Sequence, residues 1–214
     1  MALRQITYGW AAMVTLLIAP TIAAAESPGF LHSKYPNKVH AVQTTTHVLT
    51  VTGSEAKCTT LNFDSTTKTA PTSELTITPT YSGCTAFGLP ATITPNGCTY
   101  RLAQPEGSED NWKGGFAIKC PEGKKIVITA TSIFGTCVVE VGEQTPTGIV
   151  SYENETFGTG FNLAFSLSGI KDKVTTSSGV CPLTVGEHTN AIYKGGSYAE
   201  SLEGGLLAIG DVPS

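Results

Sequence analysis

The chain has 214 residues, with 13 lysines and arginines against 17 aspartates and glutamates and a formal net charge of −4. A nucleic-acid-binding protein needs a stripe of basic residues, and the densest basic group here, Lys119, Lys124 and Lys125, is too small to form one. The composition therefore excludes that class. The length is sufficient for one sizeable core that buries roughly 70% of the surface of the unfolded chain.

Residues 1–25 have the order of a secretory signal peptide. Arg4 supplies a positive charge, an apolar stretch follows, and Ala23 and Ala25 occupy the small-residue positions before a cleavage site. Cleavage after Ala25 leaves 12 basic against 17 acidic residues, a charge of −5. The alternative is an uncleaved anchor, since residues 6–25 come close to the roughly 20 apolar residues that span a bilayer. The alanine run favours cleavage, so we expect a secreted or cell-surface protein with no membrane span once the signal is removed.

Residues 26–43 contain Pro and Gly and little periodic apolar content, which predicts an extended leader before a single all-β domain at 44–214. In that domain apolar residues alternate with polar ones, most clearly from Phe161 to Leu167. Such alternation predicts strands with one buried and one solvated face. The predicted strands are 46–53, 58–63, 74–80, 90–94, 98–102, 115–120, 124–131, 136–142, 148–153, 160–170 and 190–194.

Turn-forming residues separate these segments, and no window of 11 or more residues has the apolar stripe of a helix. About ten short strands at this spacing predict an antiparallel β-sandwich or a barrel-like sheet in one domain. The segment from Gln104 to Lys113 is the most obvious inserted loop.

The number of cysteines is even, which predicts three disulfides and an oxidising compartment. The cysteines are Cys58, Cys84, Cys98, Cys120, Cys137 and Cys181. Their spacing matches no zinc motif, so we expect no metal site and no cofactor.

Local geometry suggests one set of disulfide pairs. These are Cys84 with Cys98, Cys120 with Cys137, and Cys58 with Cys181. The first follows from a turn at 95–97, the second from a strand that begins near Lys125, and the third from elimination. The main alternative joins Cys98 to Cys120, which face each other if 98–102 and 116–120 form a hairpin.

The segments TPTYSGCTAFGLPATITPNGCTYRL, KCPEGKKIVITAT and GTCVVEVGEQ resemble a group of secreted hypothetical proteins of soil actinobacteria. The similarity spans roughly Leu75 to Gln144 and is weaker at Gly169–Ile170 and Cys181–Pro182. It implies a signal peptide, paired cysteines and an all-β fold in a bacterial protein, and it carries no activity.

The sequence contains no GxSxG, HExxH, P-loop or GxGxxG motif. The four histidines, His32, His40, His47 and His188, are scattered, and we expect them at the surface, solvated or with single hydrogen bonds.

Two small groups of carboxylates invite a catalytic interpretation. One comprises Glu106, Glu109 and Asp110 in the loop PEGSEDNW, and the other Glu153 and Glu155. A glycosidase needs two carboxyl groups about 5 to 10 Å apart across a cleft. The alternative is ordinary solubilising charge, and the loop does not match the ligand spacing of a calcium site.

Trp112 follows the acidic loop directly, and an exposed ring beside polar groups is a common way to hold a sugar or a peptide. The candidate binding residues are therefore Trp112, Glu109 and Asp110. The alternative is that Trp112 covers the sheet as a core residue, as Phe87 and Tyr100 are expected to do.

These observations favour a non-catalytic secreted or cell-surface β-domain that acts by binding or as an envelope component. Its expected partner is cell-wall polysaccharide or another envelope component. The alternatives are a secreted carbohydrate-active hydrolase that uses the loop carboxylates, and a structural coat protein without a ligand.

Overall fold

The computed structural model describes residues 28–68, 72–103, 105–108, 111–156 and 158–211. These residues form strands and turns, and no helix among them could span a membrane. The predicted signal peptide lies outside the described residues. The strands are β1 (Pro28–His32), β2 (Asn37–Val51), β3 (Ser54–Thr67), β4 (Leu75–Ala86), β5 (Leu89–Thr94), β6 (Thr99–Leu102), β7 (Trp112–Gly114), β8 (Phe116–Lys119), β9 (Ile126–Ser132), β10 (Gly135–Val141), β11 (Thr147–Asn154), β12 (Gly160–Gly179), β13 (Gly186–Ser201) and β14 (Leu207–Asp211).

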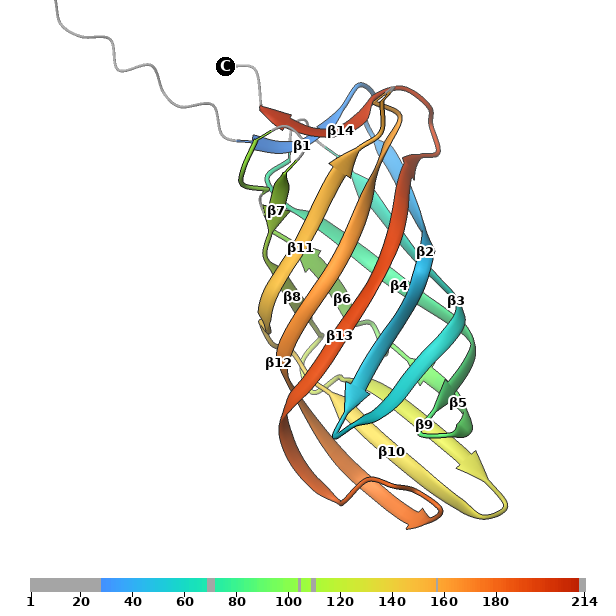
Figure 1. Cartoon of the computed structure of the whole chain (residues 1–214). Coiled ribbons are helices and arrows are strands. Elements are labelled where there is room, and N and C mark those ends of the chain that lie inside the picture. The colour runs from blue at the N-terminus through green and yellow to red at the C-terminus, as the bar shows by residue number, and fades with distance from the viewer. Residues whose placement is uncertain (1–27, 69–71, 104, 109–110, 157, 212–214) are drawn as a thin grey trace, which may run out of the picture.

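Eight of the strands close into an antiparallel barrel (Figure 1). Their order around the barrel is β10, β9, β5, β4, β3, β2, β13 and β12, and the pairing of β10 with β12 closes the ring. The all-β, antiparallel prediction is confirmed, with the barrel rather than the sandwich as the architecture. Eight strands leave an interior just wide enough for side chains or for one small ligand.

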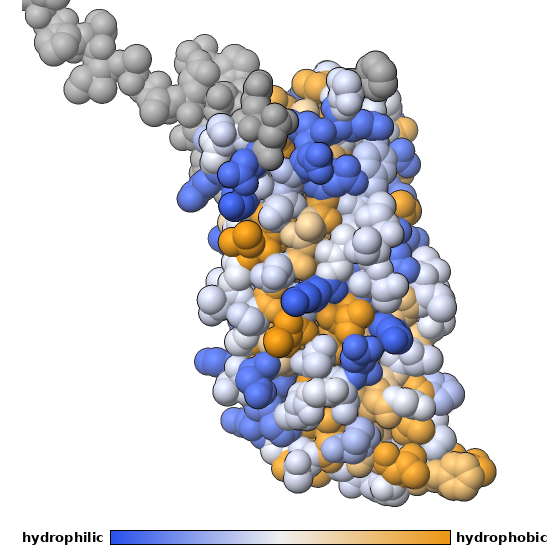
Figure 2. Space-filling model, viewed as in Figure 1, coloured by the Kyte–Doolittle hydropathy of each residue, from blue (hydrophilic) through white to orange (hydrophobic). Residues whose placement is uncertain are grey.

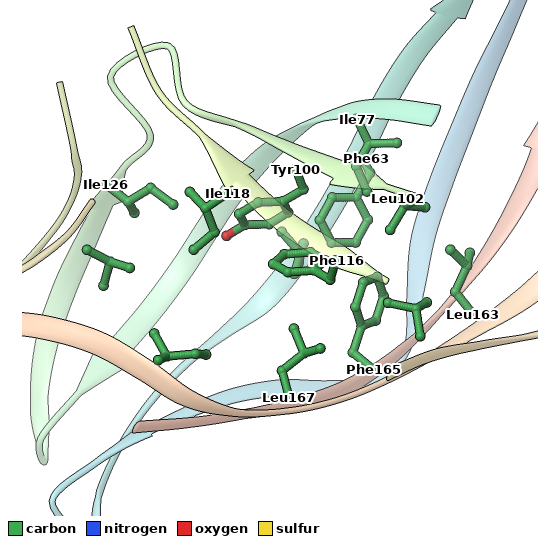
Figure 3. Packing of buried hydrophobic residues seen from close by; sticks show 14 of the residues in the cluster. Phe63, Ile77, Tyr100, Leu102, Phe116, Ile118, Ile126, Leu163, Phe165 and Leu167 are labelled. Atoms are coloured by element: carbon green, nitrogen blue, oxygen red, sulfur yellow. The ribbon is translucent and has the colours of Figure 1, made fainter. Parts of the chain in front are cut away.

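Two long strands change partners along their length. In β12, residues 161–168 pair with β11 and residues 173–179 pair with β10. In β4, residues 75–77 pair with β6 and residues 84–86 pair with β5. The hairpin of β6 and β8 carries Tyr100 and Phe116 into the interior, where their ring centroids lie 5.1 Å apart (Figure 3). Both rings belong to the buried hydrophobic core.

The ribbon of β1 and β14 covers one end of the barrel (Figure 1). Phe30 is fully buried there and lies edge-on against Tyr152, with ring centroids 5.7 Å apart. The side-chain amide of Asn154 accepts from the backbone N–H of Ile209 and donates to its carbonyl, each at 2.7 Å. These contacts fix the ribbon to β11.

The segment predicted as a leader is part of the fold. Residues 28–43 form β1 and the first half of β2, because Phe30, Val39 and Ala41 face the core and are buried. The sequence of this segment gave no sign of a strand because its apolar runs are short and interrupted by Pro and Gly. The burial of β1 depends on its pairing with β14, which is far away in the sequence.

The six cysteines form three disulfides, as predicted, but in a different pairing. The bridges are Cys58–Cys84, Cys98–Cys120 and Cys137–Cys181. The alternative Cys98–Cys120 is therefore correct, and the bridges predicted for Cys84–Cys98, Cys120–Cys137 and Cys58–Cys181 are wrong. Three disulfides indicate an oxidising environment such as the outside of the cell.

The barrel topology explains the pairing. Cys58 lies directly opposite Cys84 in the register of β3 and β4. Cys98 and Cys120 flank the two strands of the β6–β8 hairpin. Cys137 lies beside the distal end of β12, whose last residue is two positions before Cys181. Each bridge thus joins segments that strand pairing brings side by side.

Candidate functional site

A cavity of about 60 Å³ lies inside the barrel. Each of the eight barrel strands contributes at least one residue to its wall, and Tyr100, Phe116 and Ile118 of the β6–β8 hairpin complete it. One water needs roughly 10 to 15 Å³ on the same scale, so the cavity has room for roughly four to six non-hydrogen atoms.

The wall of the cavity is mainly apolar. Ile126 and Ile128 of β9 and Leu167 and Ile170 of β12 face it because alternate residues of a strand point to the same side. Among the described lining residues there is no carboxylate. Lys57 is the one charged residue there, and its ammonium group is exposed and bonded to a carboxylate of β3 at 3.2 Å. Apolar walls of this kind favour an uncharged occupant.

His47 supplies one polar contact of the cavity. Its Nε2 lies 3.1 Å from the carbonyl oxygen of Gly196 and 2.9 Å from the hydroxyl of Ser197. Because the carbonyl can only accept, Nε2 carries the proton, and Nδ1 accepts a hydrogen bond from the hydroxyl of Tyr193 at 2.6 Å. The oxygen of Tyr193 therefore keeps lone pairs for a further donor.

Tyr81 and Tyr100 form a second polar pair, with a hydrogen bond between their hydroxyl groups. One bond between two hydroxyls uses only one of the two protons, so the second can be donated to another group. Tyr81 and Tyr193 keep part of their surface exposed, although burial dominates the pKa of both hydroxyls. Both residues line the cavity.

The histidine and the three tyrosines of the cavity wall are neutral at physiological pH. Burial raises the pKa of Tyr81 and Tyr193 well above the usual value and that of Tyr100 to about 12. Burial also lowers the pKa of His47 to about 4. Such groups donate and accept hydrogen bonds but do not supply a charged base or nucleophile near pH 7.

The surface position expected for His47 is wrong. Only 4% of the residue is exposed, and its ring packs between Phe63 and Phe165, with centroid distances of 5.6 and 5.3 Å. His32 is also buried, whereas His40 and His188 are partly exposed. Both exchange a hydrogen bond with an aspartate, at 2.7 Å for His40 and 3.2 Å for His188. Within the described ranges, no three His, Cys, Asp or Glu residues are placed to hold a metal ion.

The absence of a side chain at Gly195 makes room for the His47 ring. A Cβ at that position would lie 2.4 Å from Cγ of His47 and 2.8 Å from its Cα. We expect Gly195→Ala to lower the free energy of unfolding by about 1 to 3 kcal/mol, the usual cost of overpacking. Gly142→Ala is the matched control, because a Cβ there meets nothing within 4 Å. Urea denaturation measures both variants, and equal midpoints would contradict the close fit of His47.

The structure places Trp112 in β7 with 2% of its surface exposed, so its ring is a core residue rather than an exposed platform. Glu109 and Asp110 lie outside the described residues. Glu106 is exposed, and its backbone pairs with Lys113. Trp112 and Glu106, the described residues of this group, therefore do not line the cavity.

The second group of carboxylates does not line the cavity either. Glu153 and Glu155 are exposed at the end of β11. Hydrogen bonds from Tyr198 and Thr159, at 2.6 and 3.0 Å, hold the pKa of Glu155 below its usual value. A general acid needs the opposite shift.

Comparison of the chain with family models, curated proteins and solved structures found no match. The geometry of the cavity is therefore the basis for a functional proposal.

The cavity residues were in phase with the predicted strands. His47 lies two residues before Leu49 and four before Val51, so it shares their inward face. Tyr81 continues the inward series of Leu75 and Ile77 in the same way. Alternation would have located both residues, although it does not show that the packing between them is incomplete.

Proposed function

We propose that this protein is a non-catalytic, exported binding protein that holds a small neutral molecule inside its barrel. The observation that carries the proposal is an apolar cavity bounded by all eight strands, with two neutral hydrogen-bonding pairs in its wall. Export is supported by the three disulfides and by the order of residues 1–25.

The polar groups suggest the chemistry of the ligand. Tyr193 offers an acceptor oxygen, and the pair of Tyr81 and Tyr100 offers a donor proton. An aliphatic alcohol can use both, since a hydroxyl donates and accepts. An ionised ligand would lose its hydration without gaining an opposite charge, which opposes its entry. A polysaccharide is too large for a cavity of about 60 Å³, so a small molecule replaces it as the proposed ligand of this site.

Cyclopentanol, with six non-hydrogen atoms, is a suitable probe. Cyclopentane tests whether the hydroxyl of the ligand contributes to binding, and the cyclopentylammonium ion tests whether the cavity excludes a charge. We expect NMR titration of the oxidised protein to shift the methyl signals of Ile128 and Leu167. Tyr193→Phe should weaken the binding of cyclopentanol about tenfold, because a net hydrogen bond is worth about 1 kcal/mol or slightly more. The same substitution should leave the binding of cyclopentane unchanged.

Tyr198→Phe is the matched control, because this residue lies on the same strand with its hydroxyl bonded to Glu155 outside the barrel. Ala56→Leu should fill the cavity, abolish binding of both neutral probes, and raise stability by up to about 1.4 kcal/mol, given about 24 cal/mol per Å³ of cavity. Equal binding of the cation, or binding that survives in Ala56→Leu, would contradict the proposal.

A further inference from the structure

Four exposed apolar side chains lie in the two connections at the end of the barrel opposite the β1–β14 ribbon. Ile133 and Phe134 form the turn between β9 and β10 and are 93% and 67% exposed. Val180 and Val185 lie in the connection between β12 and β13 and are 54% and 61% exposed. Figure 2 shows apolar surface at the lower end, over the β9–β10 hairpin of Figure 1. We call these four residues the apolar tip.

The two turns of the apolar tip are joined to each other. The backbone N–H of Val180 donates to the carbonyl of Phe134 at 3.1 Å, and Gly135 pairs with Gly179. The disulfide Cys137–Cys181 adds a covalent link directly behind the turns. The backbones of Phe134 and Val180 are therefore held together, and this preorganisation lowers the entropy lost on binding.

The apolar tip stands on wall segments that carry no charge. Residues 126–139 and 174–186 contain no Asp, Glu, Lys or Arg. At the overall frequency of 14%, these 27 residues would include about four. A surface without ionised groups can leave water without the large desolvation cost of a charge.

Backbone donors around the turns also have partners. The N–H of Phe134 donates to the hydroxyl of Ser132 at 3.1 Å, and that of Thr136 to the hydroxyl of Ser178 at 3.2 Å. The N–H of Cys181 donates to the carbonyl of Ser178 at 3.3 Å. Contact with an apolar medium therefore leaves these donors satisfied.

We propose that the apolar tip docks on the surface of a lipid bilayer, with Ile133 and Phe134 entering its apolar boundary. Even at roughly 250 Å² for each side chain, an upper value for an aromatic residue, the exposed fractions amount to less than about 700 Å². A standard protein interface buries about 800 Å² on each partner and adds charged and polar contacts at its rim. The small, uncharged tip fits a bilayer better than a second protein, and the proposal is independent of the ligand inside the barrel.

Sedimentation with phosphatidylcholine vesicles tests the proposal on the oxidised, exported protein. We expect binding that changes little with salt or with added phosphatidylglycerol, because the tip carries no charge. The double variant Ile133→Ser with Phe134→Ser should bind on the order of 100-fold more weakly, about tenfold for each apolar side chain. Leu202→Ser, at a 57% exposed residue between β13 and β14, should bind like the unsubstituted protein.

A second measurement follows the apolar tip itself. Phe134→Trp should give an emission maximum that moves to shorter wavelength on addition of the vesicles, against the constant signal of the buried Trp112. The urea midpoint of the double variant should be unchanged, since both residues are exposed.

Three results would overturn the docking proposal. The first is equal sedimentation of the double variant and the unsubstituted protein with the vesicles, or no sedimentation of either protein. The second is binding that requires phosphatidylglycerol and disappears in salt. The third is a dimer that the double substitution abolishes, without vesicle binding, which would make a second copy the occupant. None of these results bears on cyclopentanol binding in the barrel.

Discussion

Acidification from pH 6.5 to pH 4 is expected to lower the free energy of unfolding by about 3 kcal/mol for each of two buried histidines. Burial lowers the pKa of both His32 and His47 to about 4. From about pH 7.5 upward these histidines are neutral in both states and contribute almost no pH dependence. Between pH 6.5 and 4 the unfolded chain binds protons that the native protein does not, so stability falls.

Asp172 acts in the opposite direction. Its side chain is fully buried, and burial raises the pKa of the carboxyl group. In the interval between the ordinary and the raised pKa, the native state holds a proton that the unfolded state has released. Stability from this group therefore rises as pH falls, and it reduces the net acid effect of the histidines in the lower part of the range.

Urea denaturation between pH 7.5 and 4 measures these effects. Each histidine should contribute a slope of about 1.4 kcal/mol per pH unit. His47→Gln and His32→Gln should each remove one such contribution, whatever their effect on stability at pH 7.5. A slope that neither substitution changes would show that both histidines bind protons as readily in the native protein as in the unfolded chain.

Removal of the disulfide between Cys137 and Cys181 should lower the free energy of unfolding by about 4 kcal/mol. The two residues are 44 positions apart, and the entropy of closing a loop of that length in the unfolded chain gives this magnitude. The comparison pair is Cys98 with Cys120, 22 positions apart, for which the same relation gives about 3.4 kcal/mol. The double alanine variants are measured by denaturation without reductant. A loss below about 1 kcal/mol for Cys137 and Cys181 would indicate that the unfolded chain is already compact around this loop.

The sequence predicted the strands that have clear alternation, because one face of each is buried against the barrel interior. The longest predicted run, 160–170, belongs to β12, which continues to Gly179. β1 and β14 were missed because their segments, PGFLH and LAIGD, do not alternate apolar with polar residues. Their burial depends on pairing between the two ends of the described chain.

The disulfide pairing could not be predicted because it depends on which strands are neighbours. Cys137 faces Ala130 across β9 and β10, so the local return of the chain does not bring it to Cys120. Its partner Cys181 becomes adjacent only because β12 closes the barrel against β10.

The cavity was beyond sequence reasoning for a related physical reason. Alternation shows which face of a strand is buried, but an unfilled volume arises from the fit of eight strands and a hairpin. Tyr100 and Phe87 are core residues, as the sequence indicated, and Tyr100 also bonds Tyr81 beside the cavity.

A crystal structure of the oxidised protein soaked in cyclopentanol would test the central claim most directly. We expect one alcohol molecule inside the barrel, with its hydroxyl within hydrogen-bonding distance of Tyr193 and its ring against Ile128 and Leu167. An interior filled by repacked side chains, with cyclopentanol absent or bound only on the outer surface, would contradict it.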